Sequence, residues 1–227
     1  MVIKNYKQRS AGVKQTKFIV VLLTMFLSSA SKPSVLFIGD SHSVGIFGKR
    51  FDQLIRQSES EVITHTSCGA IGKWFRTGQK TYCGYFNRTQ NGTISSGKTG
   101  STPILDQTIS TFSPEVIIIE LGGNYTNRGD QYSIEDIDNL VTYINDQGIR
   151  CLWIGPPSSR GNERTPRLYR LIKEGVKGRC PIFNSSEVTT YPSDPNLDGI
   201  HYWGKEGKRQ ALIWATKAHE FYMSQEN

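Results

Sequence analysis

The sequence has few cysteines, and none of them is arranged as in a structural zinc site. Its 227 residues include four cysteines, and no two of these form a C-x-x-C pair. Structural zinc sites usually take their ligands from such close pairs, so the pattern argues against a zinc-bound domain. The chain also lacks an uninterrupted apolar run of about 20 residues, the length that a helix needs to cross a bilayer.

Acidic residues are absent from the first 30 positions. This segment carries five basic residues, then the apolar stretch Phe18–Leu27, then the small residues Ser28, Ser29 and Ala30. A basic lead, a short apolar core and a small-residue cleavage site are typical of a secretory signal peptide. We therefore predict a signal peptide at residues 1–30, with an uncleaved membrane anchor as the alternative. No cysteine lies near the predicted cleavage site, which argues against a bacterial lipid anchor there.

The rest of the chain has little net charge. The whole sequence carries a formal charge of +7, but five positive charges lie in residues 1–30, which leaves +2 for residues 31–227. No basic cluster elsewhere indicates a nucleic-acid-binding surface, so we expect no nucleic-acid partner. Contact with a membrane is expected only through residues 1–30, if these are not removed. Residues 31–227 have a length that suits a single domain, and the sequence does not indicate its oligomeric state.

Apolar runs alternate with amphipathic stretches through residues 31–227. Strands are predicted at 35–38, 61–66, 114–121, 149–154 and 180–183, and helices at 44–55, 104–112, 134–147, 162–176 and 205–223. This alternation predicts the α/β class, a sandwich of helices around a parallel sheet. The stretch 73–102 is rich in Gly, Ser, Thr and Asn and shows no such pattern. Its aromatic residues and its cysteine favour an ordered lid rather than a disordered loop.

Polar or glycine-containing turns follow the predicted strands. Ser41 follows the first strand, Gly69 the second and Asn124 the third, while Asp198 and His201 lie in the loop before the last helix. The carboxyl ends of parallel strands lie at one edge of a sheet, where such folds bind their ligands. We therefore expect these five residues to meet in one site.

These residue types meet the requirements of a serine hydrolase. His201 is expected to take the proton of Ser41, and Asp198 to orient the imidazole. The backbone N–H groups of Ser41 and Gly69, with the amide of Asn124, would bind the oxyanion. The alternative is that Ser41, or the aspartate before it, only caps the following helix. Neither a P-loop nor the G-x-S-x-G elbow of α/β-hydrolases is present.

The same blocks, in the same order, resemble the SGNH hydrolases, also called GDSL-type esterases. The matching residues are Gly39-Asp40-Ser41, Gly69, Gly122-Gly123-Asn124 and Asp198-Gly199-Ile200-His201. The resemblance covers nearly all of residues 31–227. It implies a flavodoxin-like three-layer α/β/α sandwich with a five-stranded parallel sheet in the order 2-1-3-4-5. It also implies catalysis by Ser41, His201 and Asp198, with no metal and no other cofactor.

At one position the sequence departs from the family pattern, and at a second position two glycines match it. His42 stands where the family name has Leu, and a similar Gly-Asp-Ser-His occurs in branches that act on acetylated sugars. The resemblance thus favours a secreted or periplasmic esterase that removes O-acetyl groups from a cell-wall or extracellular polysaccharide, or acts on another small ester. Gly72 is a second candidate for the oxyanion glycine, although Gly69 directly follows the strand. The candidate substrate contacts are His42, Trp74, Tyr202 and Trp203.

Other functions are compatible with the same residues. An acyl group on Ser41 can pass to a sugar hydroxyl instead of water, which would make the protein an O-acyltransferase. A lipase or thioesterase of the same family would act on other acyl groups with the same machinery. A carbohydrate-binding module without activity would have no reason to keep Ser41, Asp198, His201 and Asn124 together.

Four cysteines in an exported chain are expected to form two disulfides, and four cysteines allow three pairings. Cys151 and Cys180 begin the fourth and fifth predicted strands, and adjacent parallel strands lie about 4.8 Å apart, within reach of a disulfide. Cys68 directly precedes the oxyanion turn, and Cys83 lies in the predicted lid. We therefore predict the pairs Cys68–Cys83, next to the site, and Cys151–Cys180, at the opposite end of the sheet.

Overall fold

Five parallel strands form the centre of the fold. The computed structural model describes residues 1–2, 32–59, 61–161 and 163–226, so the predicted signal peptide lies almost entirely outside the described residues. The strands are β1 (Ser34–Gly39), β2 (Glu61–Ser67), β7 (Val116–Glu120), β8 (Arg150–Ile154) and β9 (Ile182–Phe183). They lie side by side in the order β2-β1-β7-β8-β9, which is the predicted order 2-1-3-4-5. The pairing places Gly39 between Thr66 and Glu120 at the carboxyl edge of the sheet.

Two further strands extend the sheet where a lid was expected. β4 (Tyr85–Arg88) pairs antiparallel with β2, and β5 (Ile94–Gly97) pairs antiparallel with β4. Within the described residues the sheet therefore has seven strands, and the prediction of a five-stranded, all-parallel sheet is wrong. The same stretch also forms α3 (Gly72–Thr77) and a small sheet of β3 (Lys80–Thr81) and β6 (Gly100–Ser101). All of β5 is exposed, so it lacks the apolar alternation by which a strand is recognised.

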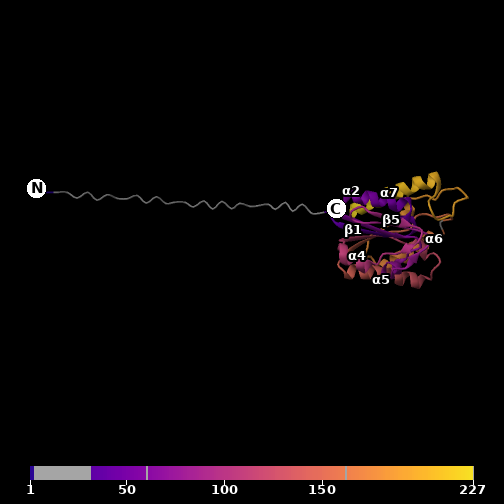
Figure 1. The fold of residues 1–227 in the computed structure, drawn as a ribbon, viewed down its shortest axis with the longest axis horizontal. Helices are drawn as coiled ribbons and strands as arrows, with labels where there is room; N and C mark the ends of the chain where they lie inside the picture. Colours follow the sequence, from indigo (N-terminus) through magenta and orange to yellow (C-terminus); the bar gives the residue numbers. More distant parts are fainter. Residues whose placement is uncertain (3–31, 60, 162, 227) are drawn as a thin grey trace. The chain divides into compact units, whose positions relative to one another are not determined.

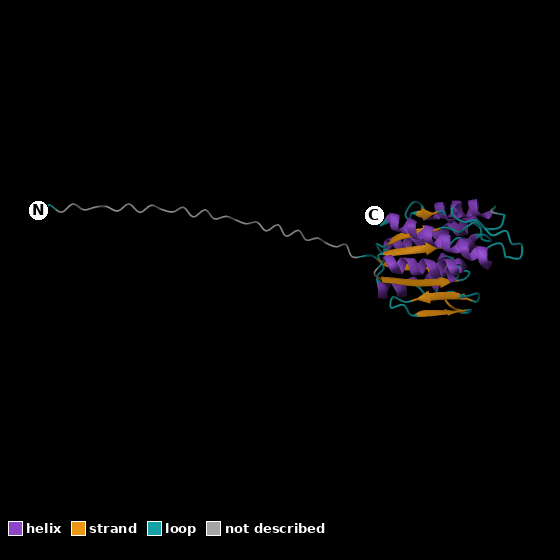
Figure 2. Cartoon of the chain, turned by 90° about the horizontal axis from the view of Figure 1, so that it is seen from above, coloured by secondary structure: helices purple, strands orange, loops and turns teal. Residues whose placement is uncertain are grey.

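Helices cover both faces of the sheet (Figure 1). One layer contains α2 (Ile46–Ser58) and α7 (Gly204–Gln225), and the other contains α4 (Leu105–Phe112), α5 (Asp130–Asp146) and α6 (Arg164–Val176). Figure 2 shows the strands lying side by side between these layers. Side chains alternate along β1, so Val35 and Phe37 pack toward α2 and α7, while Leu36 and Ile38 pack toward α5 and α6. The fold is the predicted α/β/α sandwich.

The first helix after β1 is shorter than expected. Gly45 separates α1 (Ser41–Val44) from α2, where a single helix was predicted at 44–55. The two helices pack closely: a Cβ atom at Gly48 would lie 1.9 Å from the carbonyl oxygen of Ser43. Two 3-10 helices, η1 (Gly123–Tyr125) and η2 (Ser185–Glu187), occupy other turns. No helix in the described ranges is both long and apolar enough to cross a membrane.

Both predicted disulfides are present. Cys68–Cys83 joins the turn after β2 to the segment before β4, with Cα atoms 5.5 Å apart. Cys151–Cys180 joins β8 to the start of β9, with Cα atoms 5.0 Å apart. The first bond therefore lies beside Gly69, and the second lies toward the amino ends of the strands.

Candidate active site

The turn after β1 directs Ser41 toward His201. Asp40 is the N-cap of α1, because its Oδ1 accepts the backbone N–H of His42 at 3.0 Å. Ser41 is the first residue of that helix, and its Oγ lies 2.9 Å from Nε2 of His201. The capping role thus belongs to Asp40, and the serine hydroxyl faces an imidazole.

The loop before α7 holds His201 and Asp198 together. Nδ1 of His201 lies 2.6 Å from Oδ2 of Asp198. Because a carboxylate only accepts, Nδ1 carries the proton, and Nε2 is left to accept the hydroxyl proton of Ser41. Ser41, His201 and Asp198 therefore form one continuous hydrogen-bonded chain, the arrangement of a nucleophile, a base and a group that orients the base.

Hydrogen bonds keep the Asp198 carboxylate ionised. Partial burial raises its pKa, but the His201 ring and the backbone N–H groups of His201 and Ile200 outweigh burial, so the pKa lies well below its usual range. Those two N–H groups donate to Oδ1 at 2.7 and 2.9 Å. An ionised Asp198 stabilises the imidazolium that forms when His201 takes a proton.

The two candidate oxyanion glycines have different surroundings. Gly72 donates its backbone N–H to Oη of Tyr125 at 3.1 Å, so that group is already bonded. The N–H of Gly69 has no hydrogen-bond partner in the part of the chain that the structure describes. Gly69 also has a φ of 86°, in the left-handed region that glycine adopts readily. These surroundings favour Gly69.

Asn124 links three turns at this edge of the sheet. Its Nδ2 donates to Oδ2 of Asp40 at 3.1 Å and to the carbonyl oxygen of Ala70 at 3.0 Å. The turns that follow β1, β2 and β7 are thereby connected. Both amide hydrogens are engaged, so binding of an oxyanion by Asn124 requires one of them to leave its present acceptor.

Two of the four candidate substrate contacts are accessible. Trp203 is 49% exposed, and Trp74 is half-buried beside Gly69. His42 and Tyr202 are buried, and each faces a backbone carbonyl, of Ile200 at 3.3 Å and of Ser158 at 2.7 Å. Both residues nevertheless line the small pocket beside Ser41, so the expectation that His42 and Tyr202 contact substrate stays a prediction.

Sequence analysis missed Glu120, the last residue of β7. Its side chain is fully buried, and its Oε2 accepts the hydroxyl of Ser43 at 2.7 Å. Burial, followed by the nearby charge of Asp40, raises the pKa of Glu120 well above its usual range. The available signal was a charged residue that ends the apolar run Val116–Ile119, since such a run is expected to be buried on both faces.

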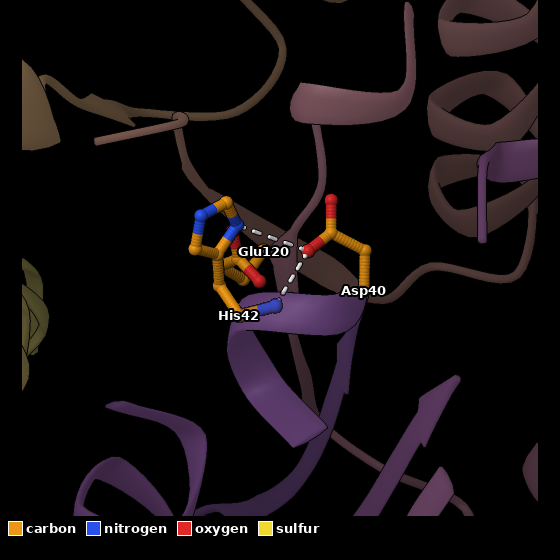
Figure 3. Close-up of side chains that lie close together, drawn as sticks. All are labelled: Asp40, His42 and Glu120. Atoms are coloured by element: carbon orange, nitrogen blue, oxygen red, sulfur yellow. Dashed lines mark hydrogen bonds and ion pairs between the residues drawn. The ribbon is translucent and has the colours of Figure 1, made fainter. Parts of the chain in front are cut away.

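Asp40, His42 and Glu120 form a buried cluster below the serine turn (Figure 3). Each offers one ligand atom, and these atoms lie within 4.8 Å of one another. Carboxylate oxygens and an imidazole nitrogen are suitable ligands for a divalent cation. Among the described residues this is the one group of three or more His, Cys, Asp or Glu side chains with such spacing.

A small pocket and a larger groove lie next to the triad. A pocket of about 20 Å³ is lined by Ser41 and His201 together with apolar side chains that include Ile46, Phe47 and Trp214. A cavity of this size holds about one water-sized group. An open groove of about 690 Å³ is lined by the hydroxyl-bearing side chains Ser158, Ser159, Ser186, Thr189, Thr190 and Tyr191, with Arg160. Oη of Tyr191 lies 3.3 Å from the carbonyl oxygen of His201, so the groove borders the base loop.

Solved structures share this architecture. No protein-family model and no curated protein matches the sequence. A GDSL-like lipase from Bacteroides thetaiotaomicron is 13% identical, with a TM-score of 0.53 over 84% of this chain and 89% of the lipase. A peptidoglycan O-acetylesterase is 13% identical, with a TM-score of 0.50 over 86% of this chain and 93% of the other. An acetyl xylan esterase is 11% identical, with a TM-score of 0.52 over 83% and 98%. The chain has the fold of the SGNH hydrolases.

Proposed function

We propose that the protein is a secreted or periplasmic serine esterase that removes O-acetyl groups from a cell-wall or extracellular polysaccharide. The observation that carries the proposal is the hydrogen-bonded chain from Oγ of Ser41 through His201 to Asp198. Such a chain activates a serine hydroxyl that is otherwise a weak nucleophile. The same three residues were expected on sequence grounds to carry the chemistry.

The geometry suggests a sequence of proton movements. As Oγ of Ser41 attacks the ester carbonyl carbon, its proton moves to Nε2 of His201. The N–H groups of Ser41 and Gly69 stabilise the negative oxygen that forms. Nε2–H then protonates the departing sugar oxygen, which leaves an acyl group on Ser41. Water, deprotonated by Nε2 of His201, attacks that group, and the imidazolium returns the proton to Oγ of Ser41 as the carboxylic acid leaves.

The small pocket supports a short acyl group. At about 20 Å³ it has room for a methyl group beside Ser41 and His201 but not for a long alkyl chain. The larger groove supports a polysaccharide substrate, because the hydroxyl groups of Ser159 and Thr190 and the exposed side chain of Arg160 suit hydrogen bonding to sugars, and exposed Trp203 offers an aromatic surface. Two of the structural neighbours, a peptidoglycan O-acetylesterase and an acetyl xylan esterase, support the same class of substrate.

Location outside the cytoplasm is supported by two separate features. The predicted signal peptide directs export. The two disulfides, Cys68–Cys83 and Cys151–Cys180, are stable in oxidising compartments.

The test compares purified parent protein with Ser41→Ala on p-nitrophenyl esters of increasing acyl length and on O-acetylated peptidoglycan. We expect the parent to prefer acetyl esters, and Ser41→Ala to lose about a thousandfold or more in kcat with an unchanged melting temperature. A folded Ser41→Ala protein with near-parental activity would refute the mechanism. Preference for long acyl chains would favour a lipase instead.

A second measurement separates hydrolysis from acyl transfer. The parent is incubated with an acetyl donor and an oligosaccharide acceptor, and free acetate is compared with acetylated product. Acetate as the main product supports the esterase. Acetylated oligosaccharide as the main product would reassign the protein as an O-acyltransferase that uses the same Ser41 intermediate.

A further inference from the structure

His42 lies at the junction of the nucleophile turn and the base loop. It directly follows Ser41 in α1, and its ring packs against the ring of His201, with centroids 5.3 Å apart. The ring of Trp214 in α7 meets it edge-on at 5.6 Å. Only 8% of His42 is exposed, so the imidazole is held in a fixed position.

Nε2 of His42 faces the base loop. It lies 3.3 Å from the carbonyl oxygen of Ile200, the residue directly before His201. A carbonyl oxygen only accepts hydrogen bonds, so the contact requires a proton on Nε2 of His42. Through this bond, α1 reaches the backbone of the loop that carries the base.

Nδ1 of His42 faces two carboxyl groups. It lies 3.4 Å from Oδ1 of Asp40 and 4.0 Å from Oε1 of Glu120 (Figure 3). Apart from these ion-pair distances, Nδ1 of His42 and Oε1 of Glu120 are buried without a hydrogen bond. Among the described residues the hydrogen bond of the His42 ring is therefore that of Nε2 to the carbonyl oxygen of Ile200.

We propose that His42 is a positioning residue that holds the loop of His201 against the turn of Ser41. Nε2–H donates to the carbonyl oxygen of Ile200, which precedes the base, and the imidazole ring packs against the ring of His201. The role rests on the proposed esterase function, in which Oγ of Ser41 must meet Nε2 of His201. His42 acts through this alignment, and its ring also lines the small pocket beside Ser41.

Three substitutions test the hydrogen bond to Ile200. His42→Gln places an amide nitrogen near the position of Nε2 and keeps the donor to Ile200, whereas His42→Asn places its amide nitrogen near Nδ1 and loses that donor. His42→Leu removes the donor at similar volume. His219→Gln is the matched control, because His219 lies in α7 and faces Ser58, away from the triad.

Because a misplacement of about 1 Å can cost roughly a hundredfold in rate, we expect His42→Leu to lower kcat on p-nitrophenyl acetate by about ten- to a hundredfold with little change in KM. His42→Gln should recover most of that loss, His42→Asn less, and His219→Gln should match the parent. If His42→Leu, shown to be folded by circular dichroism, keeps parental kcat, or if His42→Gln is no better than His42→Leu, the proposal is wrong.

A spectroscopic measurement tests the same proposal without substrate. In ¹⁵N-labelled parent protein, Nε2 of His42 should carry a proton, with His42→Gln used to assign the signals. An Nε2 without a proton, or one divalent metal ion bound per chain by elemental analysis, would overturn the assignment. If the parent hydrolyses no ester while Nε2 of His42 carries its proton, the proposed function fails and the hydrogen bond to Ile200 stands.

Discussion

The two carboxylate oxygens of Asp198 have different roles. Oδ1 accepts backbone N–H groups and shapes the loop, while Oδ2 receives the imidazole of His201. Asparagine at this position can still shape the loop, because its carbonyl oxygen also accepts backbone N–H groups. Its amide carries no negative charge, so it cannot stabilise the imidazolium of His201 as the carboxylate does.

We therefore expect Asp198→Asn to preserve the fold and to lower kcat by roughly a hundredfold or more, but less than Ser41→Ala. The measurement pairs kcat with the melting temperature. Asp194→Asn, in the same loop and exposed, is the matched control. Parental kcat in Asp198→Asn would remove Asp198 from the proposed triad.

The pH dependence of the rate should come from the base. His201 must be neutral to accept the proton of Ser41, so kcat/KM rises as pH rises and the imidazole loses its proton. Asp198 adds no second step in this range, because its pKa lies well below the usual range and it stays ionised. We expect a single rise in a profile measured from about pH 5 to 9, spanning the range in which histidine commonly titrates. A flat profile would contradict the role of His201.

The main residues of the site could be anticipated because each lies at a strand end. Ser41, Gly69 and Asn124 follow three strands, so sheet topology alone brings them to one edge. The roles of His42 and Glu120 could not be anticipated, since their contact depends on the register that sets Gly39 beside Glu120. A single sequence does not show which strands are neighbours.

At the level of elements, the central strands could be predicted and the edge strands could not. β7 is a continuous run of buried Val and Ile, whereas β5 consists of exposed, mostly small polar residues. An edge strand needs no apolar alternation, because backbone hydrogen bonds to one neighbouring strand hold it in place. β5 pairs with β4 in this way. The Cys151–Cys180 pair could be anticipated because Cys151 lies on β8 and Cys180 lies two residues before β9, and the fold class implies that these strands are adjacent.

The two disulfides should affect different properties. Cys68–Cys83 borders Gly69, so Cys68→Ser/Cys83→Ser should disturb the oxyanion turn and lower kcat more than it lowers the melting temperature. Cys151–Cys180 lies away from Ser41, so Cys151→Ser/Cys180→Ser should lower the melting temperature and leave kcat nearly unchanged. The entropy model gives about 3 to 4 kcal/mol for loops of these lengths. Equal loss of kcat in both double variants would contradict this division.

For the molecule as a whole, Glu120 makes stability depend on pH. The folded protein retains the proton of Glu120, while the unfolded chain loses it near the ordinary glutamate pKa of about 4.3. The folded state therefore binds the extra proton, and the free energy of unfolding falls as pH rises above that value, by at most about 1.4 kcal/mol per pH unit.

Glu120→Gln mimics the protonated form and removes this slope. We expect its melting temperature, relative to that of the parent, to rise from about pH 5 to 8, the range above the ordinary glutamate value. Glu115→Gln, an exposed glutamate directly before β7, is the control and should show a constant difference. A constant difference for Glu120→Gln as well would mean that Glu120 is ionised in the folded protein.

The chain enters and leaves the sheet at the edge opposite Ser41. β1 begins at Ser34 and runs toward the site, a length of about 20 Å for six residues. At the other terminus, the Glu226 carboxylate binds the guanidinium of Arg150, the first residue of β8. A fusion partner, affinity tag or solid support joined directly before β1 or after α7 therefore attaches behind the catalytic edge. Immobilised on a bead or displayed on a cell, the protein would keep its triad turned toward a bulky polymer in the surrounding solution.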